Sequence, residues 1–418
     1  MASNSSTPGR ANAVVKGTIV DQYADPYLEL VHLLQQAAGL EHSLMASYLY
    51  AAWSLKPEYV NVRGSLTDAS YMLHSTTGPR GMGVLSGDST LLQVCIEEMQ
   101  HLGKANRLLV ALGVAPNFSP HPYPYASDIY PFPLDLLSMD RYVVATFLWI
   151  EAPNGALSAD LGEPAHSPAG LNAEVAACLR DGARRHHSFD IADGPMSHVG
   201  AIYRRILAVT QRVASNPPGF LPSNTAWGHL EKSITDLMLQ GEVGHFRFFE
   251  RMFTGEAFGS DASIWDPRNP DYPSKNLIRG TAYLNRADTF EDEAVRRLAW
   301  LGNLHYWIIL SLFDTAYRYA DASDVIQRKL AYKAIGNMTQ AFWVLGCELA
   351  ERGAGMPFDP LATQYGLGRD ELSALEVIKL LVYEARDQAQ RLESDGLLPD
   401  AYDKGVFEGT LDGLTRPA

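Results

Sequence analysis

The stretch TLLQVCIEEMQHLGKANRLLVALG (residues 90–113) carries the pattern on which the fold depends. Apolar residues recur in it at intervals of three and four, which is the spacing of the inward face of a helix. The same face contains Glu98 and His101, and Gly113 is a typical helix stop. The stretch therefore predicts a helix that presents a carboxylate and an imidazole to the protein interior.

The tetrapeptide Glu-x-x-His occurs twice, as EMQH at residues 98–101 and as EVGH at residues 242–245. Residues i and i+3 lie on one face of a helix about a turn apart, so each pair can hold a metal ion from one side. Helical bundles that bind two metals complete such a site with one Glu from each of two other helices. The sequence should therefore supply two further inward carboxylates.

Two lone glutamates fit this requirement. Glu41 lies in an apolar helical pattern over residues 26–55, and Glu151 follows the apolar run VVATFLWI in a pattern over 139–153. Further helical patterns cover 197–213 and 229–253, the second of which contains EVGH. Runs with the alternation of a strand are scarce, so the predicted fold class is all-α.

The predicted metal ligands are Glu41, Glu98, His101, Glu151, Glu242 and His245. A single Glu-x-x-His is more often a solvated helix face, but two copies that alternate with lone glutamates favour a dinuclear site. Burying four carboxylates without cations would cost several kcal/mol per charge. Mixed oxygen and nitrogen ligands suit iron or manganese better than zinc, so we expect two iron ions, with a Mn/Fe pair as the alternative.

The remaining patterns divide the chain into three parts. Residues 1–24 are predicted to be a flexible tail, residues 25–262 the metal-binding bundle, and residues 263–418 an additional C-terminal helical region. Within the bundle, 114–137 is a proline-rich loop and 154–197 is expected to be irregular. The C-terminal region has helical patterns near 287–320, 322–352 and 370–395.

The composition excludes several classes of partner. The net charge is −14 and no cluster of Lys and Arg offsets it, which argues against nucleic acid and anionic lipid. The three cysteines are far apart, and the N-terminus lacks the apolar core of a signal peptide. No apolar run reaches the roughly 18 residues of a membrane span. We expect a cytoplasmic protein.

Four stretches carry a family resemblance: LLQQAAGLEHSLMASYLYAAWSLK, EEMQHLGKANRLLVALG, FLWIEAP and SHVGAIYRRI. They resemble the ferritin-like domain of iminophenylpyruvate dimer synthases, which couple oxidised tryptophan-derived units in violacein and rebeccamycin assembly. The resemblance covers roughly residues 26–255 and is most specific around Glu41, Glu98 and His101. It implies a ferritin-like four-helix bundle and a redox role on a small organic molecule in bacterial secondary metabolism.

Other polar residues carry predictions too, but none of them is a predicted metal ligand. Tyr48 is two turns from Glu41 on the same helix face, so it is a candidate catalytic residue, although a packed core tyrosine explains the pattern too. His42 points away from Glu41 and is assigned an outer or surface role. His186 and His187 are expected to be solvated, and His305 to be a hydrogen-bonded core histidine.

Three functions remain open at this point. The first is a dinuclear non-haem iron oxidase or oxygenase that uses dioxygen or peroxide to oxidise a small, amino-acid-derived molecule. The second is a ferritin-type protein that oxidises and stores iron without an organic substrate. The third is a binding module with vestigial ligands, and the complete ligand set argues against it. Each of them is compatible with a homo-oligomer.

Glu97 and Glu98 both precede His101, and only one is predicted to be a ligand. The inward stripe consists of Leu91, Val94, Glu98, His101, Ala105, Leu108 and Leu112. It excludes Glu97, and the second motif has Gly241 at the corresponding position. We therefore expect Glu98→Ala to remove at least one metal ion, and Glu97→Ala to behave as an exposed substitution that leaves both, as metal analysis of the two variants would show.

Overall fold

The computed structural model describes residues 19–65, 90–125, 127, 130, 132–152, 171–187, 191, 199–222, 225–319, 324–361 and 370–414. The helices in these residues are α1 (Pro26–Ser54), α2 (Val60–Arg63), α4 (Leu91–Ala111), α5 (Arg141–Ile150), α6 (Leu171–His187), α7 (Val199–Ser215), α8 (Trp227–Thr254), α9 (Glu293–Arg318), α10 (Asp324–Asn337), α11 (Trp343–Glu351), α12 (Glu371–Ser394) and α13 (Gly405–Leu414). This part of the chain contains no β-strand, only isolated bridges such as that between Leu55 and Ser274. The predicted all-α class is confirmed.

Side-chain caps fix where the bundle helices begin. Asp25 accepts from the backbone N–H of Leu28 at the start of α1, and Asp140 accepts from Val143 at the start of α5. Thr90 and Gln93 form a reciprocal capping box at the start of α4. Such caps satisfy backbone donors that a helix leaves unpaired, so these boundaries follow from local sequence.

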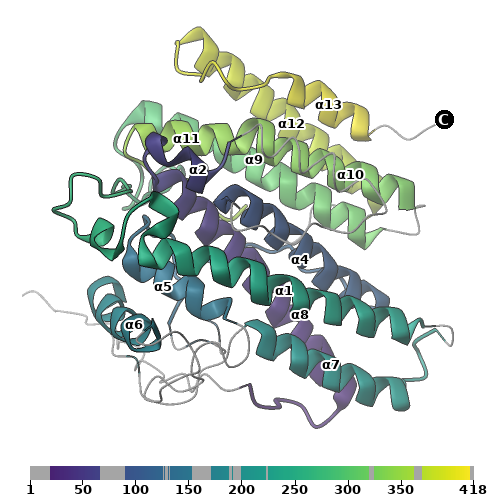
Figure 1. The fold of residues 1–418 in the computed structure, drawn as a ribbon. Helices are drawn as coiled ribbons and strands as arrows, with labels where there is room; N and C mark the ends of the chain where they lie inside the picture. Colours follow the sequence, from purple (N-terminus) through teal and green to yellow (C-terminus); the bar gives the residue numbers. More distant parts are fainter. Residues whose placement is uncertain are drawn as a thin grey trace, which may run out of the picture.

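The first half of the chain packs its helices around one core (Figure 1). Helix α1 lies along α4 and α7, while α8 contacts α4, α5 and α7. Almost the whole of α1 from Leu33 onward is buried. The helices that carry the predicted ligands are therefore held side by side in one packed bundle.

Helix α6 was not predicted. Residues 154–197 were expected to be irregular, but Leu171–His187 form a helix whose Leu171, Val175 and Leu179 are buried. A Cβ on Gly182 would lie 2.0 Å from the ring of Tyr142 on α5, so this glycine permits close packing of the two helices. The glycines and prolines around this segment made it look irregular, although its apolar residues recur every four positions. Residues 153–170 lie outside the described part.

The C-terminal helices form a second layer against α1 and α4 (Figure 1). Helix α9 contacts α4, and α11 contacts α1, where Trp53 packs against Phe342, Trp343 and Phe358. The helical patterns near 322–352 and 370–395 are confirmed, with a π-helical turn at Met338–Phe342 that joins α10 to α11. Helix α13 was not predicted.

The segment between the bundle and the C-terminal helices also packs on the bundle. Lys56 donates its backbone N–H to the carbonyl of Pro273, and Lys275 donates to that of Ser54. Leu277 donates to Ser138 Oγ. No helix in the described residues has the length and apolar character needed to span a membrane.

Two helical glycines should respond in opposite ways to alanine. A Cβ on Gly346 would lie 2.1 Å from the indole of Trp53, so Gly346→Ala should overpack the contact between α11 and α1 and destabilise the protein by about 1–3 kcal/mol. A Cβ on Gly336 would meet only Gln340 Oε1, at 3.7 Å. Gly336→Ala should therefore stabilise α10 by roughly 0.5–1 kcal/mol. Thermal unfolding of both variants tests this, and equal shifts would contradict the packing described.

Candidate metal centre

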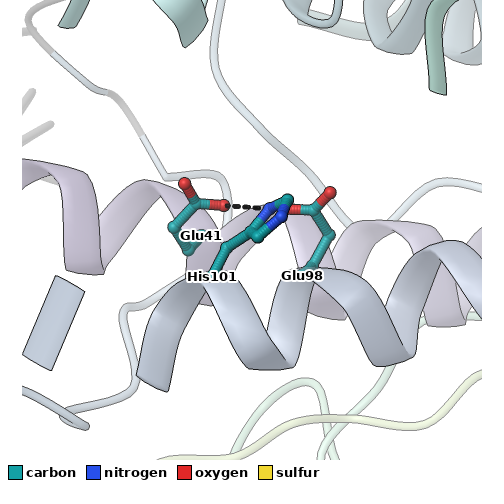
Figure 2. A group of neighbouring side chains, drawn as sticks. All are labelled: Glu41, Glu98 and His101. Carbon is teal, nitrogen blue, oxygen red and sulfur yellow. Dashed lines mark hydrogen bonds and ion pairs between the residues drawn. The ribbon is translucent and has the colours of Figure 1, made fainter. Parts of the chain in front are cut away.

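Two groups of three buried side chains lie at the centre of the bundle. The first consists of Glu41, Glu98 and His101 (Figure 2), and the second of Glu98, Glu151 and His245. In each group the candidate ligand atoms all lie within 4.8 Å of one another. Glu98 belongs to both groups, so the two half-sites share one carboxylate.

Four helices supply these residues, each for a local reason. Glu41 lies in the middle of α1, and Glu98 and His101 face it from α4, one turn apart. Glu151 is the C-cap of the short helix α5, which ends before Pro153 as predicted. His245 comes from α8. Residues from four distant parts of the sequence thus meet because their helices pack on one another.

The two oxygens of Glu98 face different histidines. His101 Nδ1 lies 3.3 Å from Glu98 Oε2 and 3.9 Å from Glu41 Oε2. His245 Nδ1 lies 2.9 Å from Glu98 Oε1 and 3.5 Å from Glu151 Oε2. Glu98 therefore has the geometry of a bridging carboxylate, with Glu41 and Glu151 at the two ends.

Several atoms of this cluster are buried without a hydrogen-bond partner in the described part of the chain. They include Glu41 Oε2, Glu98 Oε1 and His245 Nδ1. The side chains of Glu41 and Glu98 are 2% exposed and that of His245 is 0% exposed. Unpaired acceptors in a dry interior are costly, and a cation at each half-site would satisfy them. The donor set fits iron or manganese, for which oxygen and imidazole ligands are suitable.

Without metal, Glu41, Glu98 and His245 have raised pKa values, whereas the pKa of His101 is lowered. Burial and the neighbouring Glu98 carboxylate raise the pKa of Glu41 well above its usual value, and burial and Glu151 raise the pKa of Glu98. Burial lowers the pKa of His101. Burial also acts to lower the pKa of His245, but the surrounding carboxylates, Glu151 first, outweigh it and raise that pKa well above the usual value.

Two tyrosines hold the outer carboxylates. Tyr48 donates to Glu151 Oε1 at 2.7 Å, and Tyr203 from α7 donates to Glu41 Oε1. Each hydrogen bond leaves the other carboxylate oxygen turned toward a histidine. Tyr48 is thus both a packed core residue and a neighbour of the cluster, which combines the two explanations that the sequence offered. Tyr203 was missed, although it lies in an inward stripe with Ile202, Ile206 and Val209.

The expectation that Glu97 is exposed is wrong, and so is its consequence that Glu97→Ala would behave as an exposed substitution. Its side chain is 8% exposed, and its Oε2 lies 3.0 Å from His245 Nε2. Helix α4 contacts α1, α8 and α9, so it is covered on more than one side and a single inward stripe underestimates what is buried. Glu98 is inward, as predicted, but its neighbour is buried too.

The predictions for the remaining polar residues are confirmed in some cases and wrong in others. His305 is a buried histidine bonded to Asn337 Oδ1 and the Tyr402 hydroxyl, as predicted. His42 is buried and lies 2.7 Å from the Tyr306 hydroxyl, which excludes the surface role. The side chain of His187 is 6% exposed, so its predicted solvation is wrong. His186 is exposed, as predicted, and bonds to Asp140. The side chain of Glu242 lies outside the described residues, although its backbone belongs to α8.

Part of the chain is similar to a known protein family. A family model described as Ferritin-like matches residues 34–236, a range that contains four of the five clustered residues. A solved structure of a ferritin-like protein from Caulobacter vibrioides is similar at 16% identity and a TM-score of 0.42, over 80% of this chain and 98% of that one. No curated protein matches the sequence. The chain is therefore an all-α protein whose residues 34–236 match the Ferritin-like family model.

Proposed function

We propose that this protein is a dinuclear non-haem iron oxidoreductase that oxidises a small organic molecule with dioxygen or peroxide. The observation that carries the proposal is the pair of buried triads joined by Glu98. Ferritin-like di-iron bundles hold their metals with one Glu from each of two helices and a Glu-x-x-His motif from each of the other two. The buried, unpaired oxygen and nitrogen atoms support it independently.

In this proposal, the clustered residues would hold two metal ions. Glu41 and His101 would hold one ion, Glu151 and His245 the other, and Glu98 would bridge them, with Glu242 as a further ligand from α8. When bound, the ions would supply the redox chemistry that activates the oxidant. The hydroxyls of Tyr48 and Tyr203 orient Glu151 and Glu41, and Tyr48 can pass a proton at Glu151 Oε1.

The substrate class follows from the resemblance to iminophenylpyruvate dimer synthases. We assign an amino-acid-derived imine or 2-oxo acid of bacterial secondary metabolism, processed in the cytoplasm. Iron-loaded protein would be mixed with such compounds and oxidant, and the products analysed by mass spectrometry. An oxidised organic product supports the proposal. Rapid oxidation and mineralisation of many irons per chain without organic turnover would instead establish iron storage.

Metal content provides the first test. Protein reconstituted anaerobically with Fe(II) should hold about two ions per chain, as a carboxylate-bridged pair requires. Glu98→Gln keeps the size of the side chain but should lose metal from both half-sites, because Glu98 belongs to both triads. Glu29→Gln is the matched control, since Glu29 is buried on α1 but bonds only to the backbone of Gln22 and Tyr23. One ion per wild-type chain, or zinc retained in preference to iron, would contradict the proposal.

Metal binding should release protons. Glu41, Glu98 and His245 have raised pKa values in the metal-free protein, so they retain protons that a cation must displace. The apparent metal affinity should therefore increase from about pH 6 to about pH 8, and a weakly buffered solution should acidify on metal addition. Titrations at several pH values with a pH indicator measure both effects. An affinity that does not change over this range would show that the cluster is already deprotonated.

A further inference from the structure

The two histidines of the cluster are held differently on their outer sides. His245 Nε2 lies 3.0 Å from Glu97 Oε2, and both side chains are buried. His101 Nε2 is buried as well but has no hydrogen-bond partner in the described part of the chain. Only one of the two imidazoles therefore has a carboxylate behind it.

This contact decides which nitrogen of His245 faces the cluster with a free lone pair. An ionised carboxylate can only accept, so the hydrogen bond to Glu97 requires the proton on Nε2. Once the ring is neutral, as a metal ligand must be, an unprotonated Nδ1 faces Glu98 Oε1 and Glu151 Oε2. A carboxylate in this position fixes the orientation of a ligating histidine and makes it a stronger ligand.

The two half-sites also differ in the carboxylates around them. Glu97 belongs to neither triad and places a further carboxylate beside His245. In the described part of the chain, no such carboxylate bonds to His101 Nε2, so the two positions are unequal for a cation.

We propose that Glu97 is a positioning residue that orients His245, so that the Glu98–Glu151–His245 position binds the first metal ion and the Glu41–Glu98–His101 position the second. The inference rests on the proposed dinuclear centre and adds an order of loading to it. It also assigns a role to a residue that the helical pattern had placed outside the site.

Titration with Co(II) tests the order, because its visible absorption reports ligand geometry as well as occupancy. Wild-type protein should bind Co(II) in two steps. The spectrum of the first step should persist in His101→Ala and disappear in His245→Ala. This assignment does not depend on turnover.

Variants of Glu97 test its role. Glu97→Ala should weaken the first step by roughly 10- to 100-fold and leave the second step unchanged. Glu97→Gln, which still offers an acceptor oxygen to His245 Nε2, should be affected less. Glu29→Gln, a buried carboxylate away from the cluster, should leave both steps as in the wild type. If Glu97→Ala fails to fold, the comparison of Glu97→Gln with Glu29→Gln carries the test.

Failure of the loading order and failure of the dinuclear centre would give different results. Two equal binding steps that neither Glu97 variant changes would overturn the loading order and leave the dinuclear centre intact. Loss of both ions from folded Glu97→Gln, checked by circular dichroism, would make Glu97 a direct ligand and overturn its positioning role. A wild-type protein that binds no Co(II) would overturn the proposed function itself.

Discussion

Four carboxylates that lie in a dry helical interior are the constraint on which the rest of the structure depends. Glu41, Glu97, Glu98 and Glu151 are all buried. Uncompensated, each charge would cost several kcal/mol, which is a large share of the stability of a typical fold. The bundle meets this cost with two imidazoles, with hydroxyls from neighbouring helices and, in our proposal, with two metal cations. Every helix that contributes to the cluster must therefore be held in place.

The C-terminal layer provides much of that restraint. Helix α1 carries Glu41 toward the cluster, while the adjacent His42 bonds to Tyr306 of α9 on another side of the same helix. Further along α1, Trp53 is enclosed by aromatic rings from the π-helical turn at Met338–Phe342, from α11 and from the segment that follows. Because α1 is covered on several sides, it has little freedom to rotate or slide. The position of Glu41 thus depends on packing far from the site.

The residues of the cluster are arranged symmetrically, but the residues around them are not. Each outer carboxylate receives a hydrogen bond from a tyrosine, and each faces one histidine, with Glu98 between them. The contact between Glu97 and His245 breaks this symmetry. In our proposal, this contact makes the two metal positions chemically different, so that the two ions would differ in affinity and in reactivity.

The sequence by itself determined the four helices that carry the cluster and five of the residues that meet in it. Helical periodicity and caps are local properties, so α1, α4, α5 and α8 follow from the chain, and Glu41, Glu98, His101, Glu151 and His245 follow from their inward positions. Only the tertiary structure decided that Glu97 is buried, that Tyr203 reaches Glu41 and that α6 and α13 form. The reason is physical: a periodic pattern gives one buried face of a helix, whereas the number of neighbours that cover the other faces is set by how all the helices pack.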